Sequence, residues 1–415
     1  MFTLRCLRCN FLAGVEERGL TCPLCHGQLV IEYDYDAIAE KAREVFDGHV
    51  TGMWKYLPLL PLADMRNIVT MGEGGTRVVR AANLGRYLGL SQLLLKIEAW
   101  NPTGSHKDRQ ISLATSRALE LRYQLALTSS SGNVGAAVAA YTSRAGIKSV
   151  IMVPNVIPEE KMIQISAYGG FVVVVDTPDN VEVANLVEKL VKEFGAYDMV
   201  TAAPHNPYTL EAGRTIAFEI FEQIKPLPDI IVTPVGGGGL LGSLWKGFTD
   251  LVKLGFVDEK EIPRLVGVQA EGCQPFVRAV RERWPLEKVL NTPWEQIRTI
   301  CTALADTIPL DAMAAIPAVK ETGGTAIAVS DAETLEAGKL LSSMEGIFAE
   351  PSSNVCIAAI RRLVEAGWIK SSDRVLSLVT GTGLKDLRSI RAVISPPTKI
   401  RPSLGEAVSI IRQFI

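Results

Sequence analysis

One lysine of the sequence stands where its amine could act as a nucleophile. Lys107 lies in the segment Asn-Pro-Thr-Gly-Ser-His-Lys-Asp-Arg at residues 101–109, shortly after an apolar run. Pro and Gly end that run, and Ser105 can cap a helix beginning at His106, which places Lys107 in the first helical turn. A helix N-terminus disfavours a cation, so this lysine tends toward the neutral amine that forms imines. A lone lysine of this kind is usually a solvated surface residue, so the interpretation depends on what surrounds it.

Two further segments carry groups that could bind an anion. Residues 129–135 read Ser-Ser-Ser-Gly-Asn-Val-Gly, which puts hydroxyls (Ser130, Ser131) and the carboxamide of Asn133 at a helix start. Asn133 could also bond a phenolate-like oxygen. Residues 236–239 are four consecutive glycines, whose N–H groups can converge on a phosphate because no Cβ obstructs them. The alternative for residues 129–135 is a simple capping loop, and the alternative for the glycine run is a flexible linker. The glycine run matches neither the Walker pattern nor the dinucleotide-binding pattern.

A fourth segment completes the set. Residues 380–386 read Thr-Gly-Thr-Gly-Leu-Lys-Asp after an apolar run, and the hydroxyl of Thr380 could face a heterocyclic nitrogen. Capping is again the alternative for this segment alone. In parallel α/β sheets, ligands bind where loops leave the carboxyl ends of strands. Together the four loops offer an imine-forming amine, an anion cradle, a carboxamide and a hydroxyl, which one aromatic aldehyde phosphate requires.

Four of the seven cysteines lie within the first 25 residues, as two Cys-x-x-Cys pairs: Cys6 with Cys9 and Cys22 with Cys25. This spacing is typical of a tetrahedral all-cysteine zinc site. Such a zinc would be structural, because four sulfurs leave no open coordination position. A vestigial ribbon or reactive thiols are the alternatives. The other three cysteines are expected to be buried small hydrophobic residues.

The composition excludes several classes of protein. The 415 residues are 47% hydrophobic and 21% charged, with a formal net charge of −2. Without a basic block there is no electrostatic reason to expect nucleic acid or anionic lipid as a partner. The apolar runs are strand-sized, far short of a membrane span, and the start lacks the apolar core of a signal peptide. We therefore expect a cytoplasmic enzyme with a small-molecule substrate.

Short β-branched runs alternate with helix-length segments along most of the chain. This alternation predicts an α/β fold with largely parallel sheets and helices on both faces. The predicted strands are residues 93–97, 124–128, 149–153, 171–175, 230–233, 264–269 and 374–379. The predicted helices are residues 33–45, 135–144, 158–168, 181–194, 210–224, 332–343, 353–366 and a tail helix at 404–414, expected to pack on the body or on a partner subunit.

The chain resembles the threonine synthases, within the fold-type-II family of pyridoxal-5′-phosphate (PLP) enzymes. The resemblance runs from the four-cysteine segment through the loops at 101–109, 129–135 and 236–239 to the Gly-Thr-Gly-Leu-Lys-Asp element, in the family's order. It implies two open α/β domains of the tryptophan-synthase-β kind and a PLP-dependent lyase acting on an amino acid. It also implies that Lys107 carries PLP as a Schiff base and that the enzyme is a homodimer.

The resemblance further implies roles for individual residues. Asn133 bonds the 3′ oxygen of PLP, Thr380 bonds its ring nitrogen, and the loop Gly236, Gly237, Gly238, Gly239 and Leu240 holds its phosphate. A threonine hydroxyl there leaves the ring nitrogen unprotonated, which suits eliminations. The residues expected near the substrate are Ser105, His106, Ser130, Ser131, His205 and Arg214.

The sequence departs from the family where the substrate's phosphate should bind. Threonine synthases usually read Asn-Ser-x-Asn-Pro-Tyr-Arg, whereas this chain has Ala203, Pro204 and Thr209 in place of the amide, hydroxyl and arginine. Next to Lys107, His106 replaces the usual phenylalanine, and a packing role for it is as plausible as a catalytic one. Threonine synthase remains the first hypothesis. The alternatives are a serine/threonine ammonia-lyase or β-replacement enzyme, and a non-catalytic PLP- or metal-binding protein.

The same reasoning divides the chain into regions. Residues 1–33 form a zinc-ribbon-like segment, residues 34–107 and 208–395 a larger α/β domain with the phosphate loop, and residues 108–207 a smaller α/β domain. Residues 396–415 form the tail.

Overall fold

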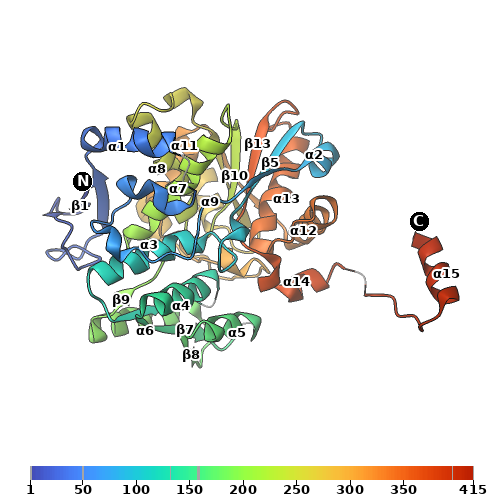
Figure 1. The fold of residues 1–415 in the computed structure, drawn as a ribbon, viewed down its shortest axis with the longest axis horizontal. Coiled ribbons are helices and arrows are strands. Elements are labelled where there is room, and N and C mark those ends of the chain that lie inside the picture. Colours follow the sequence, from blue (N-terminus) through green and yellow to red (C-terminus); the bar gives the residue numbers. More distant parts are fainter. Residues whose placement is uncertain (1, 49–50, 131, 157–158, 395, 415) are drawn as a thin grey trace.

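The computed structural model describes residues 2–48, 51–130, 132–156, 159–394 and 396–414. Its strands form three sheets, two of them mostly or entirely parallel, so the predicted α/β class is confirmed. In Figure 1 the largest sheet lies in the upper part of the molecule, the second in the lower part, and the N-terminal sheet at one side.

The largest sheet has the strand order β12-β11-β10-β13-β5-β4. Neighbouring strands within this sheet pair in parallel, except β4 and β5, which pair antiparallel at its edge. Along β10, Ile230 and Val232 enter one hydrophobic core with residues of α12 and α13, while Ile231 enters another with residues of α7 and α8. Alternate side chains of this buried strand thus pack against helices on opposite faces of the sheet.

The second sheet has the order β8-β7-β6-β9 and is parallel throughout. Its main core combines α3 and α4 with the strands, including Ile111, Ala137 and Ile151. The outer strand β8 leaves Phe171 and Val174 exposed. The N-terminal sheet, β2-β1-β3, is antiparallel and packs through Leu4 against residues of α3 and α7.

The elements have the following bounds. The strands are β1 (Phe2–Cys6), β2 (Leu12–Ala13), β3 (Leu29–Tyr33), β4 (Val78–Arg80), β5 (Gln92–Ile97), β6 (Leu125–Thr128), β7 (Lys148–Pro154), β8 (Phe171–Val175), β9 (Tyr197–Asp198), β10 (Ile230–Pro234), β11 (Arg264–Ala270), β12 (Thr325–Val329) and β13 (Arg374–Val379). The α-helices are α1 (Tyr35–Asp47), α2 (Ala82–Leu88), α3 (Lys107–Glu120), α4 (Asn133–Ala145), α5 (Glu159–Ala167), α6 (Asn180–Phe194), α7 (Tyr208–Gln223), α8 (Gly239–Lys253), α9 (Pro275–Arg281), α10 (Leu286–Asn291), α11 (Ala312–Glu321), α12 (Asp331–Glu345), α13 (Pro351–Glu365), α14 (Leu387–Arg391) and α15 (Leu404–Phe414).

The C-terminal helix is formed where the sequence predicts it but stands away from the rest of the chain. Figure 1 shows α15 at the end of an extended segment, beyond α14. Its apolar residues Leu404 and Ile411 are 83% and 57% exposed. The structure does not place this helix against the body of its own chain, so packing on a partner subunit, the other expectation, stays a prediction. Among the described residues, no helix combines the length and the apolar character needed to cross a membrane.

Candidate active site

Three of the four loops singled out in the sequence follow three neighbouring strands. In the largest sheet β10, β13 and β5 lie side by side and parallel. The glycine run follows β10, Thr380 follows β13, and the loop that leads to Lys107 follows β5. The carboxyl ends of parallel strands share one edge of a sheet, so these loops meet at a single place. The fourth loop, ending at Asn133, follows β6 of the second sheet.

Backbone hydrogen bonds tie the lysine loop to the loop after β13. The N–H of His106 donates to the carbonyl of Thr380 at 2.9 Å, and the N–H of Thr382 donates to the carbonyl of Gly104 at 2.9 Å. Ser105 and Gly381 form an antiparallel bridge between them. Lys107 therefore starts α3 at a fixed distance from the end of β13.

Lys107 has the environment of a nucleophilic amine. Its Nζ lies 3.1 Å from Thr201 Oγ1 and donates a hydrogen bond to it. Desolvation lowers the pKa of this amine, while the negative charges of Asp306 and Asp311 act in the opposite direction. A lysine with a lowered pKa is more often unprotonated, which is the form that attacks a carbonyl.

Two buried polar side chains lie at the ends of this region. Thr380 is 2% exposed, and its Oγ1 lies 2.9 Å from Ser353 Oγ at the start of α13. Asn133 is 7% exposed, and its amide nitrogen donates to Glu350 Oε1 at 2.8 Å. The Asn133 Oδ1 atom is buried and has no hydrogen-bond partner among the described residues.

The glycine run forms a cradle at the N-terminus of α8. Gly238 has φ of +102°, a conformation that favours glycine, and a Cβ there would lie 2.8 Å from Ala315 Cβ. Two carboxylates face the cradle: a Cβ on Gly236 would lie 2.6 Å from Asp306 Oδ2, and one on Gly239 would lie 2.8 Å from Asp311 Oδ2. Burial raises the pKa of the Asp306 carboxyl, while the charge of Lys107 and a backbone hydrogen bond from Gly237 act in the opposite direction. N–H groups at the start of a helix, unobstructed by Cβ atoms, suit a phosphate.

Comparison with known proteins agrees with this geometry. The family model described as "Pyridoxal-phosphate dependent enzyme" matches residues 69–381. A threonine synthase of Methanocaldococcus jannaschii is 37% identical over 413 residues, 99% of either chain. This chain belongs to the pyridoxal-phosphate dependent enzyme family. A threonine synthase of Methanosarcina acetivorans is 36% identical over 402 residues, 96% of either chain, so the resemblance to the threonine-synthase branch is confirmed as well.

Solved structures share the fold of this PLP-dependent lyase. A processed threonine deaminase from Solanum lycopersicum superposes with a TM-score of 0.67 at 19% identity, covering 87% of this chain and 93% of the other. Maize serine racemase gives a TM-score of 0.62 at 20% identity, covering 82% and 93%.

The chemical groups that these loops bring together match the groups of PLP. The cradle offers backbone donors for a phosphate, and Lys107 offers an amine for an aldehyde. Asn133 and Thr380 are buried polar side chains with hydrogen-bonding capacity left over, as a bound heterocycle needs. The two aspartates at the cradle were missed by sequence reasoning, because they lie in a segment without a motif.

Most of the other predicted residues lie around the PLP enzyme's site. Ser105 is buried in the bridge to Gly381, and Ser130 Oγ accepts from the N–H of Gly132 at 3.4 Å within its own loop. Ser131 lies outside the described residues. Burial, followed by the charge of Lys107, lowers the pKa of His106 to about 3. A neutral His106 whose Nδ1 lies 3.4 Å from the Thr380 carbonyl fits the packing role.

Arg214, the arginine considered as a substrate ligand, is paired with carboxylates. Arg214 is 1% exposed, is ion-paired with Asp250 and Glu211, and lies over the ring of Tyr33. A substrate role for Arg214 therefore stays a prediction, and the structure shows its charge already compensated by two carboxylates. His205 remains near the site, since the neighbouring Ala203 N–H donates to Asp311 Oδ1 at 2.8 Å. Hydrogen bonding to Asp198 raises the pKa of His205.

A buried ion-pair network anchors the first turn of α3. Arg109 bonds Glu98 at 2.8 Å and Glu219 at 2.6 Å, and Lys96 bonds Glu219 at 2.6 Å. All four side chains are at most 3% exposed. These residues come from α3, α7, β5 and the turn after β5, so the network joins the helix that carries Lys107 to the largest sheet. Removing one partner would leave a buried charge uncompensated.

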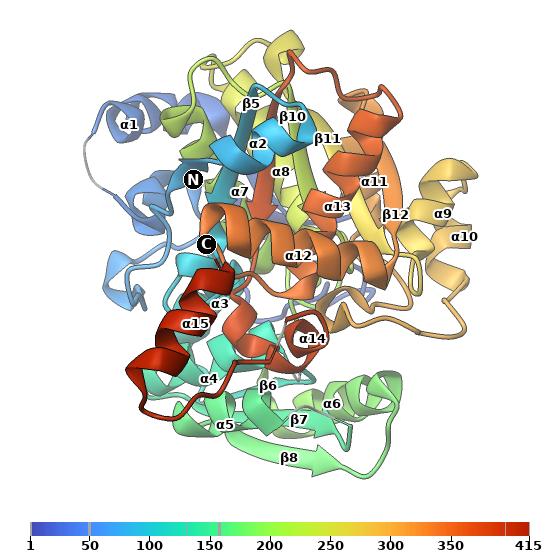
Figure 2. The same ribbon diagram turned by 90° about the vertical axis from the view of Figure 1, so that its right-hand side faces the viewer.

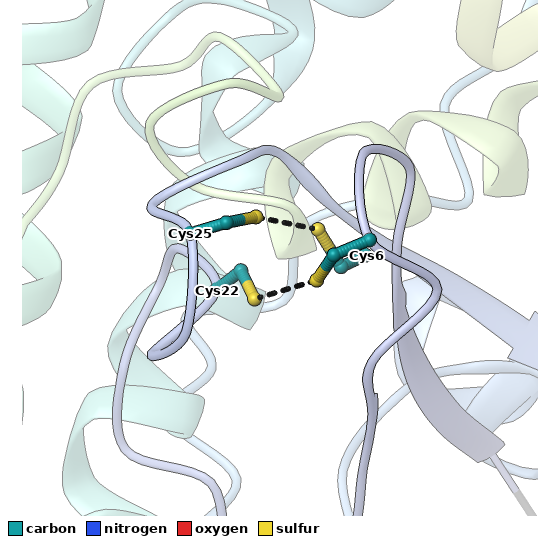
Figure 3. Close-up of side chains that lie close together, drawn as sticks. Cys6, Cys22 and Cys25 are labelled. Carbon is teal, nitrogen blue, oxygen red and sulfur yellow. Dashed lines mark hydrogen bonds between the residues drawn. The ribbon is translucent and has the colours of Figure 1, made fainter.

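The four N-terminal cysteines come together as the spacing predicts. Their sulfur atoms all lie within 4.8 Å of one another, with Cys6 and Cys25 at 3.5 Å and Cys9 and Cys22 at 3.6 Å. Figure 3 shows side chains from the two knuckles turned toward a common centre. Zinc–sulfur bonds of about 2.3 Å in a tetrahedron place sulfurs about 3.8 Å apart, so these thiols have the spacing of a zinc ligand set.

Proposed function

We propose that this chain is a threonine synthase, which converts O-phosphohomoserine and water into threonine and phosphate. The similarity to curated threonine synthases over nearly the whole chain carries this proposal. The convergence of Lys107, Asn133, Thr380 and the glycine cradle supports it at the level of the site.

Each residue of the site has a proposed task. Bound PLP supplies an electron sink for the substrate's α-carbon. Lys107 would hold the cofactor through its amine, and the free Nζ would take the substrate's α-proton. The N–H groups of Gly236 to Leu240 hold the cofactor's phosphate, and Asn133 and Thr380 orient its ring. Overall the Cγ–O bond to the substrate's phosphate breaks and phosphate leaves with that oxygen. Cβ loses one proton and bonds the oxygen of one water molecule, and Cγ gains a proton to become the methyl group of threonine.

The substrate's phosphate needs a partner that Ala203, Pro204 and Thr209 do not supply. We place His205 in this role. Its Nδ1 lies 3.4 Å from Asp198 Oδ2, which raises its pKa and favours the imidazolium form. A charge-assisted hydrogen bond to a phosphate contributes about 1.5–3 kcal/mol.

The second candidate is a serine or threonine ammonia-lyase, or a β-replacement enzyme acting on a non-phosphorylated amino acid. The loss of the family's amide, hydroxyl and arginine at residues 203, 204 and 209 favours it. The fold is shared with threonine deaminase and serine racemase.

A substrate panel on the purified holoenzyme distinguishes the two. We expect phosphate and threonine from O-phosphohomoserine, and no 2-oxo acid from serine or threonine. The reverse pattern would reject threonine synthase in favour of the lyase. His205→Gln should raise KM for O-phosphohomoserine at least tenfold, whereas exposed His26→Gln in the N-terminal segment should not.

We also propose a structural zinc at Cys6, Cys9, Cys22 and Cys25, a homodimeric assembly and a cytoplasmic location. The proposed divisions are residues 1–33, residues 34–107 with 208–395, residues 108–207, and the tail 396–415. The three separate sheets support them.

A further inference from the structure

The first turn of α13 lies against the end of β13, where Thr380 is placed. Ser353 Oγ lies 3.0 Å from the backbone N of Thr380, 2.9 Å from the backbone N of Gly381 and 2.9 Å from Thr380 Oγ1. Ser353 and Thr380 are each 2% exposed. One serine hydroxyl thus makes three close contacts with a residue of the candidate site and its neighbour.

The protons in this group can be counted. A serine hydroxyl has one O–H to donate and two lone pairs to accept. Backbone N–H groups can only donate, so Thr380 N–H and Gly381 N–H occupy both lone pairs of Ser353. Ser353 then has no lone pair for the Thr380 proton. Its own proton points to Thr380 Oγ1 at 2.9 Å, since the alternative acceptor, the Gly381 carbonyl, is 3.4 Å away.

The hydroxyl proton of Thr380 is consequently left without an acceptor. Ser353 is the one hydrogen-bond partner of Thr380 Oγ1 within the described part of the chain. Leaving a buried polar group unpaired costs about 1–3 kcal/mol, so a ligand in the site should supply an acceptor. A neutral pyridine nitrogen is an acceptor, whereas a protonated one is a donor.

We propose that Ser353 is a positioning residue that fixes the Thr380 hydroxyl as a hydrogen-bond donor to the ring nitrogen of PLP, and so keeps that nitrogen unprotonated. This rests on the proposed placement of Thr380 against the ring. Ser353 itself does not touch the cofactor; it acts through Thr380.

The titratable groups around Thr380 are arranged consistently with this. From the lysine loop, neutral His106 faces the Thr380 carbonyl, not its hydroxyl. From the residue before α13, Glu350 would contact a Cβ on Gly381 but accepts from the Asn133 amide. Lys385 acts on Glu350 by charge. Within the described residues, the hydrogen bonds of Thr380 Oγ1 thus include no carboxylate that could share a proton with the ring.

The test is the ¹⁵N chemical shift of full-length enzyme loaded with PLP labelled at the ring nitrogen, recorded between about pH 6.5 and 9. We expect the shift of an unprotonated, hydrogen-bonded nitrogen that does not change with pH. Thr380→Val should move the signal downfield, to that of a nitrogen without a donor. Ser353→Ala should move it part of the way, and Ser353→Thr, which keeps the hydroxyl, should restore the wild-type shift.

The possible outcomes distinguish the role of Ser353 from the placement of Thr380 at the ring nitrogen, on which that role depends. An unchanged shift in Ser353→Ala, with a moved shift in Thr380→Val, overturns the role of Ser353 alone. An unchanged shift in Thr380→Val overturns the placement of Thr380 as well. If Ser353→Ala does not fold, the wild-type titration decides, because a protonated ring nitrogen at any pH in this range contradicts the proposal.

Discussion

Lys107 and the carboxylates around it define the chemistry at the scale of single residues. Sequence reasoning could predict Lys107, Asn133 and Thr380 because each belongs to a loop with several polar or glycine residues in a row. It could not predict Asp306, Asp311, Glu350 or Ser353. These side chains reach the site from segments whose local sequence has no special pattern, and only the packing of distant elements brings them there.

Lys107→Ala should abolish the covalent attachment of PLP without unfolding the protein. The variant should lose the visible absorbance of the lysine-bound cofactor, and borohydride should trap no adduct on the chain. Lys192→Ala, an exposed lysine on α6, is the control and should keep both signals. A reducible adduct that persists at the active site of the Lys107 variant would show that another lysine carries the cofactor.

Asp306→Asn should strengthen PLP binding, because the carboxylate faces the loop that has to accept a dianionic phosphate. Through partly aqueous surroundings this repulsion is about 1 kcal/mol, which corresponds to about a fivefold lower Kd. Titration of the cofactor-free enzyme with PLP measures it, with Asp36→Asn on α1 as the control. Weaker binding in the Asp306 variant would mean that the carboxylate supports the loaded site.

At the scale of elements, the seven predicted strands all occur, and the structure adds others. β12 was missed because its five residues, Thr-Ala-Ile-Ala-Val, follow two glycines and include two alanines. β4 has three residues, too few to show an alternation. The predicted helix at 158–168 occurs as α5, although its predicted first residue lies outside the described residues. Long periodic segments could thus be predicted. Short edge strands could not, because they form only by pairing with a neighbouring strand that is distant in the sequence.

Gly238→Ala should weaken PLP binding at least tenfold. The alanine would have to adopt φ of +102° and bring its Cβ within 2.8 Å of Ala315 Cβ, which distorts the cradle. Gly346→Ala is the matched control, since Gly346 also has positive φ (+68°) but has open space around it. Both variants should lose some thermal stability, but the Kd for PLP should change in the Gly238 variant alone. Equal Kd values in the two variants would show that the glycine loop does not bind the phosphate of PLP.

At the scale of the whole molecule, the N-terminal ribbon is joined to the catalytic body. Tyr33 OH donates to Glu211 of α7 at 2.9 Å, and Tyr123, just after α3, donates to the Arg18 carbonyl at 2.8 Å. The ribbon thus braces α3 and α7, the helices nearest Lys107 (Figure 2 shows them in the body of the molecule). Hydrophobic patterning could predict the tail helix but not its position, because packing depends on surfaces that a single sequence does not reveal.

Zinc should be present at about one ion per chain in anaerobically purified protein. Cys6→Ser should lose the ion and lower Tm, because only three of the four thiolate ligands remain to cross-link the N-terminal segment through zinc. Turnover per folded enzyme should change little. Cys356→Ser, in the buried core of α13, should lower Tm without loss of metal. Wild-type protein free of zinc would contradict the assignment.

The most direct test of the whole account is the fate of oxygen when the holoenzyme acts on O-phosphohomoserine in ¹⁸O-labelled water. The account predicts threonine with one ¹⁸O in its hydroxyl group and unlabelled phosphate, because the Cγ–O bond breaks and water adds at Cβ. Labelled phosphate together with homoserine would reveal simple phosphate-ester hydrolysis. That result, or no turnover of this substrate, would contradict the proposal that the chain is a threonine synthase.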